Sequence, residues 1–100
     1  MPADCDQVQL ELDLAAQKLK VCGHPVRLRL LCMIAREEDP CVSELWACLN
    51  QPQPVISQHL AVLKDKGIVK SEVNGNRRIY SIVDPFIQSI VNSLASCNHA

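Results

Sequence analysis

Aromatic residues are scarce in this sequence, which holds one Trp, one Tyr and one Phe among 100 residues. A hydrophobic core therefore has to be built from Leu, Ile, Val and Ala, which favours helices packed on helices. A chain of this length forms one domain that buries a modest fraction of its surface, so a second subunit would add considerably to its stability. We therefore expect residues 1–100 to form a single, mainly helical domain.

Long apolar runs are missing as well. No stretch approaches the ~18 residues that a membrane-spanning helix requires, and the acidic N-terminus MPADCDQVQLELDL lacks the composition of a signal peptide. The chain is therefore expected to be cytoplasmic, with no membrane partner. Cysteine, by contrast, is plentiful with six residues. In a reducing cytosol these are expected to be buried thiols, metal ligands or redox sensors rather than disulfides.

Recognisable catalytic patterns are also absent. The sequence shows no Ser-His-Asp pattern, no Gly-rich phosphate loop and no paired catalytic carboxylates. Its histidines fit non-catalytic roles, and His24, which stands where a helix would begin, is expected to cap or pack there. The sequence therefore predicts neither an enzyme nor a required cofactor.

Charge is balanced overall but unevenly distributed. The formal net charge is −1, yet the first 14 residues carry four acids and no base, whereas residues 51–80 carry five bases against two acids. A locally basic segment can face phosphates on a protein that is close to neutral overall. The second half of the chain is therefore the part that charge favours for binding nucleic acid.

The first half of the sequence has the spacing of three helices. Apolar residues recur at helical intervals over residues 7–21, with Asp6 available as N-cap. Pro25 suits the first turn of a second helix, and a short third helix is expected from Val42 to Leu49. The second helix is expected to have an apolar side and a solvent-facing side, consisting respectively of Leu28, Leu31, Cys32 and Ala35 and of Arg27, Arg29 and Arg36.

The second half predicts a helix, a hairpin and a final helix. Pro54 can open a fourth helix, which should stop at Gly67 because glycine is the usual left-handed C-terminal cap. Strand-like residues on either side of 74–76, which read Asn-Gly-Asn, predict a β-hairpin with a type I′ turn. Asp84 is expected to cap the last helix. The order α-α-α-α-β-β-α is that of a winged helix-turn-helix, mainly α with a small β-hairpin.

Such a fold binds double-stranded DNA by placing its second helix-turn-helix helix in the major groove. The N-terminal half of the fourth helix is rich in side chains that can hydrogen-bond base edges or phosphates, and two arginines beside the hairpin tip suit a wing along the phosphate backbone. The predicted DNA-binding residues are Gln53, Ser57, Gln58, His59, Lys64, Arg77 and Arg78. A winged helix that binds proteins instead of DNA is the alternative, which the basic wing disfavours.

Four stretches carry a resemblance to a known family. The segments CGHPVRLRLLCMI, VSEL, QPVISQHLAVLKDKGIV and NGNRRIYSIVD closely resemble the ArsR/SmtB family of bacterial dimeric repressors, in order and over roughly residues 12–96. The resemblance implies a homodimer formed by the first and last helices, a palindromic operator, and release of DNA when an effector binds. The sequence departs from the family pattern at Gln51-Pro52, where the family commonly has an apolar residue and Ser.

The resemblance also implies an effector site, and the family uses more than one. The branch that senses persulfides and oxidants, the BigR/SqrR/HlyU type, carries one thiol on the second helix and one on the last, and Cys32 and Cys97 resemble this pair. The chemistry needs an accessible thiolate and a nearby resolving thiol. The favoured prediction is therefore a repressor that releases DNA when Cys32 and Cys97 react with reactive sulfur or an oxidant.

The metal sites of the family fit this sequence less well. The third-helix site for As(III) and soft metals needs Cys-Val-Cys, but here Ser43 replaces the second thiol; Cys41 could still recruit Cys5 from the N-terminal arm of the other subunit, with Cys48 as a distant third. The zinc site on the last helix needs ligands where Phe86 and Ala100 stand. Sensing of As(III) or a soft metal is therefore the alternative, and cysteines that only pack, with some other signal, a further one.

Overall fold

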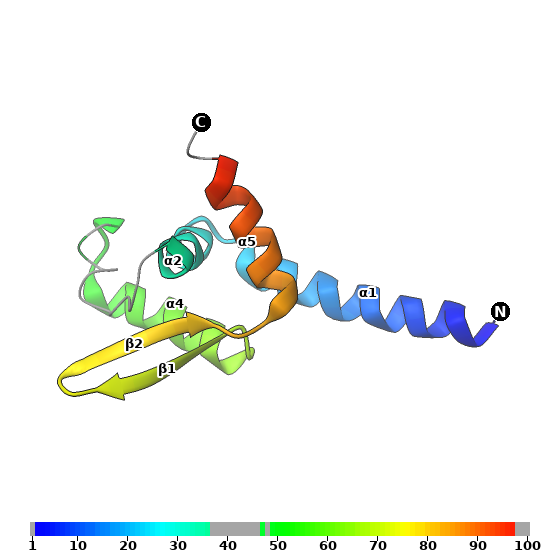
Figure 1. The fold of residues 1–100 in the computed structure, drawn as a ribbon, viewed down its shortest axis with the longest axis horizontal. Helices are drawn as coiled ribbons and strands as arrows, with labels where there is room; N and C mark the ends of the chain where they lie inside the picture. Colours follow the sequence, from blue (N-terminus) through cyan, green and yellow to red (C-terminus); the bar gives the residue numbers. More distant parts are fainter. Residues whose placement is uncertain (1, 37–46, 48, 98–100) are drawn as a thin grey trace.

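The computed structural model describes residues 2–36, 47 and 49–97. Its elements follow the predicted order (Figure 1): α1 Pro2–Cys22, α2 Pro25–Arg36, α4 Gln53–Asp65, β1 Val69–Asn74, β2 Arg77–Ile82 and α5 Pro85–Cys97. The predicted fold class, mainly α with a small antiparallel hairpin, is confirmed. Most of the expected third helix lies outside the described residues, although Ala47 and Leu49 are helical. In the part of the chain that the structure describes, every helix falls short of the length and apolarity needed to cross a bilayer.

Helix α1 is longer than predicted and projects from the body of the molecule (Figure 1). It begins at Pro2, so Asp6 lies inside the helix and the prediction that Asp6 is its N-cap is wrong. A proline in the first turn has no hydrogen bond to lose, and no helix breaker follows before Gly23. The projecting helix contributes to the elongated shape of the protomer, whose extents are 52 × 33 × 22 Å.

The core lies around α2, between α5 on one side and α4 with the hairpin on the other (Figure 1). Its largest fully buried side chains are Leu30, Leu31, Ile56, Leu60, Leu63, Ile68, Ile87 and Val91. The predicted apolar side of α2 is partly wrong, because Leu30 and Ile34 are buried whereas Leu28, Cys32 and Ala35 are only half-buried. Leucine, methionine and isoleucine surround more than half of this helix, so sequence spacing alone cannot select its innermost line.

The end of α4 confirms the predicted glycine cap. Gly67 has a φ of 73°, its backbone N–H donates to the carbonyl of Lys64, and the N–H of Ile68 donates to the carbonyl of Leu63. These two bonds define a Schellman motif. The motif reverses the chain, so that β1 packs against the helix that precedes it.

Replacing Gly67 with Ala is expected to destabilise the protein by about 1 kcal/mol, because a side chain disfavours the left-handed conformation. Space is not the cause, since an added Cβ would have no neighbour within 4 Å. Urea unfolding followed by circular dichroism measures the change. Gly67→Asn is the matched control and should recover part of the loss, because Asn tolerates this conformation better than Ala.

The hairpin forms as predicted, but its turn differs from the predicted type. Strand β1 pairs with β2 in the register Asn74↔Arg77, which leaves Gly75 and Asn76 as the two turn residues. Only Gly75 has a positive φ, of 65°. A type I′ turn would require positive φ at both central residues, whereas a type II′ turn requires it at the first alone. The turn is therefore of the II′ pattern, because the register places the glycine first.

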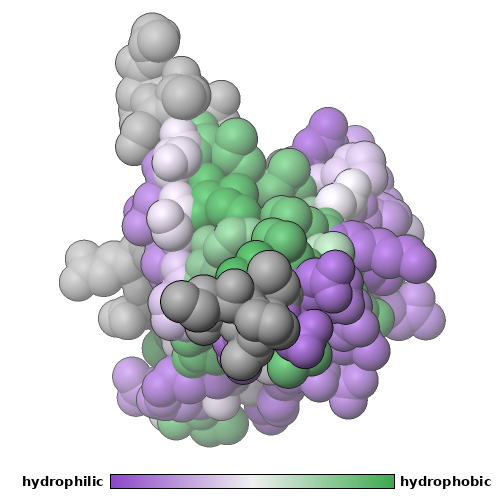
Figure 2. Space-filling model, turned by 90° about the vertical axis from the view of Figure 1, so that its right-hand side faces the viewer, coloured by the Kyte–Doolittle hydropathy of each residue, from purple (hydrophilic) through white to green (hydrophobic). Residues whose placement is uncertain are grey.

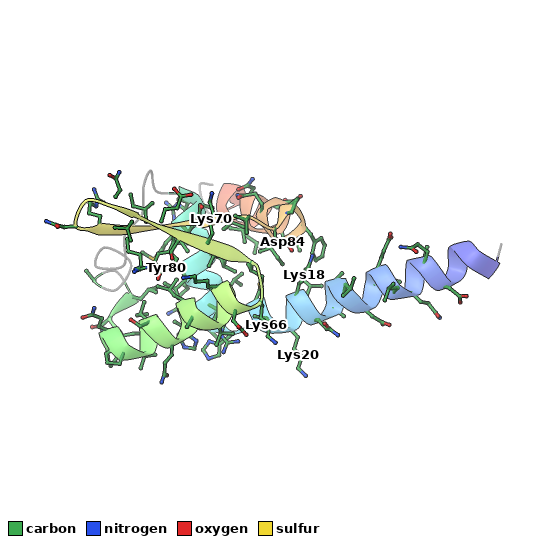
Figure 3. The ribbon with its side chains drawn as sticks, turned by 90° about the horizontal axis from the view of Figure 1, so that it is seen from below. Lys18, Lys20, Lys66, Lys70, Tyr80 and Asp84 are labelled. Carbon is green, nitrogen blue, oxygen red and sulfur yellow. The ribbon has the colours of Figure 1, made fainter. Side chains whose placement is uncertain are left out.

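Asp84 caps α5, as predicted, and also joins α5 to α1. One carboxylate oxygen accepts the backbone N–H of Ile87 at 3.1 Å, and the other lies 2.6 Å from the Nζ of Lys18 (Figure 3). Burial alone would raise the pKa of this carboxyl, but the Lys18 ammonium and the backbone N–H groups of Ile87 and Phe86 outweigh it and lower the pKa below its usual value. Both oxygens of Asp84 are therefore already engaged.

Candidate nucleic-acid interface

Helix α4 has a buried face and an exposed face. Ile56, Leu60 and Leu63 point into the core. Four of the predicted DNA-binding residues are exposed: Gln53, Ser57, Gln58 and Lys64. The helical period explains the division, because the three buried residues recur at intervals of three and four and leave the other side of the helix to polar side chains. The exposed face can therefore offer hydrogen-bond donors and acceptors to a ligand.

The hairpin continues this polar surface. Figure 1 shows the hairpin and α4 on the lower side of the molecule and α5 on the upper side, and β1 packs against α4. Arg77 and Arg78 stand exposed at the start of β2. Across the hairpin, the Arg78 guanidinium donates to the Ser71 hydroxyl at 3.3 Å. The exposed face of α4 and a cationic hairpin thus share one side of the molecule.

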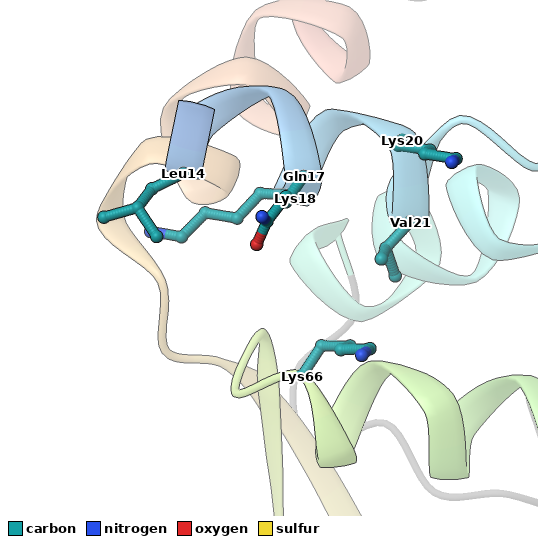
Figure 4. A pocket seen from close by; sticks show the side chains of 6 residues that line it. All are labelled: Leu14, Gln17, Lys18, Lys20, Val21 and Lys66. Carbon is teal, nitrogen blue, oxygen red and sulfur yellow. The ribbon is translucent and has the colours of Figure 1, made fainter. Parts of the chain in front are cut away.

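A cationic groove separates the end of α1 from the end of α4, as Figures 3 and 4 show. Its volume is about 360 Å³, and it is lined by Leu14, Gln17, Lys18, Lys20, Val21 and Lys66. Lys18 is neutralised by Asp84, whereas Lys20 and Lys66 are exposed. Sequence reasoning missed this groove, because residues far apart in the sequence meet only through the packing of α1 on α4. It adds positive charge beside the C-terminal end of α4.

His59, also predicted to bind DNA, differs from its neighbours because it is half-buried. Its Nδ1 accepts a hydrogen bond from the Nε of Arg27 at 3.1 Å, and its ring centroid lies 4.5 Å from that of His24. Burial, followed by the charges of His24 and Arg27, lowers the pKa of His59. One side of the imidazole is therefore bound within the protein, which leaves DNA contact through its other nitrogen as a prediction.

Two further residues of this cluster have roles at the helix junctions. Arg27, predicted to face solvent, is half-buried and also donates to the carbonyl of Val21 at the end of α1, at 3.2 Å. The solvent-facing prediction for Arg27 is therefore wrong. His24 accepts the backbone N–H of Val26 through Nδ1 at 3.1 Å, which confirms that it caps α2. No sequence signal joined Arg27 to His59, since 32 positions separate them.

Two cysteines have described side chains, and both are free thiols. Cys22 is buried and Cys32 is half-buried. Burial raises the pKa of both; at Cys32 the Arg36 guanidinium opposes this effect. Cys32 lines an open hollow of about 430 Å³ together with Leu28, Arg29, Met33, Arg36, Leu49 and Leu94.

The remaining candidate thiols are not described in this way. Cys97 is the last residue of α5 and Cys5 lies on α1, but their side chains are outside the described part, as are Cys41 and Cys48 altogether. Within the described residues, His, Cys, Asp and Glu form no group of three that could hold a metal ion. The proposed Cys32–Cys97 pair and the alternative set of Cys5, Cys41 and Cys48 therefore both stay predictions.

Comparison with known proteins agrees with this architecture. Residues 24–71 match the profile described as bacterial regulatory protein, arsR family. An HTH-type transcriptional regulator of Methanocaldococcus jannaschii is 40% identical over 77 residues, which cover 77% of this chain and 86% of that protein. The crystal structure of a predicted DNA-binding transcriptional regulator from Escherichia coli matches with a TM-score of 0.85 and 32% identity, over 92% of this chain and 97% of that chain. The transcriptional repressor BigR from Xylella fastidiosa matches with a TM-score of 0.74 and 31% identity, over 97% and 95%.

Proposed function

The chain belongs to the ArsR family of regulatory proteins, and on that premise we propose that it is a homodimeric repressor that binds a palindromic operator and releases it when its thiols react. The observation that carries the DNA-binding part is the surface shared by α4 and the hairpin. The exposed side chains of α4 can contact base edges in the major groove, and the cationic hairpin can lie along the phosphates. We therefore name α4 the recognition helix and the hairpin the wing.

The apolar residues of α1 support the homodimer. Val8, Leu10, Leu12, Leu14 and Leu19 are each about half exposed or more, and Phe86 and Leu94 of α5 are exposed as well. Figure 2, viewed from the end toward which α1 points, shows apolar side chains gathered in the middle of this face. An exposed apolar area of this kind marks an interface. The occupant that fits is a second copy of this chain, because a two-fold axis places the same helix against itself.

A dimer also suits the two-sided character of α1. Leu12 and Leu19 lie on one side of the helix with Val8, whereas Leu14 and Val21 lie on the other. Leu14 and Val21 line the groove facing α4 of the same chain. Leu19 lines a smaller hollow with Leu94 and other apolar residues of α2 and α5. One side of α1 can thus serve its own protomer while the other covers the partner.

The effector proposal rests on the surroundings of Cys32. Helices α2 and α5 pack together, and Leu94 of α5 lines the same hollow as Cys32. Cys97 follows Leu94 by three residues, and residues three apart share one side of a helix. The backbone of Cys97 therefore lies about one turn beyond a residue that faces the Cys32 hollow. This placement supports Cys32 and Cys97 as the sensing pair over the alternative set around Cys41.

The chemistry of such a pair balances with a persulfide R–S–SH as the oxidant. The Cys32 thiolate attacks the terminal sulfur, the R–S to S bond breaks, and RS⁻ leaves with a proton from solvent as RSH. The Cys97 thiolate then attacks the Sγ of the Cys32 persulfide, forming the Cys32–Cys97 disulfide and releasing HS⁻. Both cysteines are oxidised and the sulfane sulfur is reduced to sulfide. Arg36 favours the attacking thiolate by partly offsetting the effect of burial on its pKa.

The DNA-binding part is tested by removing charge from the wing. The variant Arg77→Gln/Arg78→Gln is expected to weaken operator binding at least tenfold at physiological salt, and to reduce the slope of log K against log salt by about two, one for each lost phosphate contact. Operators are first selected from a random DNA library, and affinities are then measured by fluorescence anisotropy at several salt concentrations.

The matched control removes two positive charges from α2. The variant Arg29→Gln/Arg36→Gln is expected to retain the wild-type salt slope, because both residues lie on the opposite side of the molecule beside α5. Equal losses from the wing and α2 variants would mean that overall charge, rather than the wing, carries the affinity. Failure of the library to yield an inverted repeat would favour the protein-binding alternative.

A further inference from the structure

Arg27 joins three helices through one side chain. It belongs to α2, its Nη1 donates to the Val21 carbonyl at the end of α1 at 3.2 Å, and its Nε donates to His59 of α4 at 3.1 Å. Its guanidinium is half-buried between these elements. His59 stands in the middle of α4, directly after the exposed Ser57 and Gln58. The orientation of α4 is thus tied to α1 and α2 at one polar point.

The two bonds that hold the imidazoles of this cluster require both rings to be neutral. His59 accepts from Arg27 through Nδ1, and His24 accepts the Val26 N–H through its own Nδ1. An imidazole that accepts at Nδ1 carries its proton on Nε2, and a protonated ring can accept at neither nitrogen. Protonation would therefore turn an acceptor into a donor at each bond. It would also place a second positive charge beside the Arg27 guanidinium.

We propose that Arg27 is the positioning residue of the recognition helix, that it acts through neutral His59, and that operator affinity consequently falls when His59 takes up a proton. This inference rests on the proposed DNA-binding role of α4 and goes beyond it. The bond aligns the segment of α4 that carries Ser57 and Gln58. Its loss leaves α4 attached to the body only through the apolar contacts of its inner face.

The charges around His59 determine the sign of the effect. His24 faces it from the α1–α2 junction and Arg27 from α2, and both oppose its protonation, in addition to burial. The pKa of His59 is therefore lowered from 6.5 in the folded protein. Between that lowered value and 6.5 the unfolded chain binds more protons than the folded one, so folding stability declines as pH falls below about 6.5. A stabilising role for the imidazolium would require the opposite shift.

The experiment measures operator affinity by anisotropy from pH 7.5 to 5.5 at constant ionic strength. Wild-type affinity is expected to fall on acidification, with a limit of tenfold per pH unit for one proton. His59→Gln retains an acceptor for Arg27 and has no titrating ring, so it should bind within about threefold of wild type at pH 7.5 and show a flat pH profile. The chain has three histidines, and His99→Gln is the control that should keep the wild-type profile.

Two results would overturn the proposal. A wild-type affinity that rises on acidification would mean that the His59 imidazolium binds phosphate directly, and a His59→Gln profile as steep as that of wild type would place the proton elsewhere. The free protein gives an independent test, since Arg27→Gln should raise the pKa of His59 in an NMR titration, with circular dichroism verifying the fold. An unchanged pKa there also contradicts the proposal. Absence of operator binding at pH 7.5 would instead reject the proposed function, while the NMR result still decides the Arg27–His59 link.

Discussion

Replacing Leu12 and Leu19 with Asp is expected to convert the proposed dimer into a monomer and to weaken operator binding at least a hundredfold. Both side chains lie on one side of α1 and are about half exposed or more in the protomer, at 62% and 46%. Burying two carboxylates in an apolar interface is strongly unfavourable. A monomer also loses the gain from binding two half-sites as one unit, which is on the order of 10²–10⁴ in affinity. Sedimentation velocity measures the oligomeric state, and anisotropy measures the affinity.

A control with the same two added negative charges is available on the same helix. Gln7→Glu/Gln9→Glu changes exposed polar positions and is expected to leave both the dimer and the operator affinity within about twofold, since exposed charges contribute little. A Leu12→Asp/Leu19→Asp protein that still sediments as a dimer would show that α1 is not the interface. A monomer that binds operator with full affinity would show that dimerisation is not needed for DNA binding.

The Cys32→Ser and Cys97→Ser variants are each expected to bind operator as wild type does and to lose release by glutathione persulfide completely. Each substitution removes one of the two thiols that the proposed disulfide requires, and a hydroxyl cannot replace a thiolate in this chemistry. Anisotropy follows release, and mass spectrometry of the intact protein detects the covalent link. In the wild-type protein the expected product is a Cys32–Cys97 bond.

Cys22 provides the matched control for this experiment. Its thiol is buried, and burial together with the nearby Asp84 carboxylate raises its pKa, so Cys22→Ala should respond to persulfide as wild type does. Release of both Cys32→Ser and Cys97→Ser at the wild-type level would reject the pair. Stoichiometric As(III) bound through Cys5 or Cys41, with an unchanged Cys32–Cys97 dithiol, would move the sensor to the metal-binding alternative.

The features that the sequence predicted correctly depend on local chemistry. Gly67 ends α4 because glycine readily adopts a positive φ, and Asp84 caps α5 because its carboxylate reaches an N–H three residues away. The hairpin follows from strand-like residues on both sides of a turn. The order of elements and the exposed polar face of α4 could therefore be predicted from spacing alone.

The incorrect predictions involve positions where local chemistry leaves several outcomes open. Helix α2 is apolar around more than half its circumference, so only packing against α4 and α5 decides that Leu30 rather than Leu28 is fully buried. Arg27 has the composition of a solvent-facing residue, but its partners lie on two other helices. The turn type depended on whether Gly75 came first or second in the register. Each of these facts is a property of the assembled fold.

The projecting helix α1 has a thermodynamic consequence. Its first turns extend beyond the protomer (Figure 1), and a helix without packing partners is only marginally stable in water. In the proposed dimer the apolar side of α1 is covered by the other subunit, so ordering this helix and associating are one event. Folding would then be a bimolecular equilibrium, and the melting temperature would rise with protein concentration. The amount of repressor present would therefore set how much of it is folded, as well as how much operator it occupies.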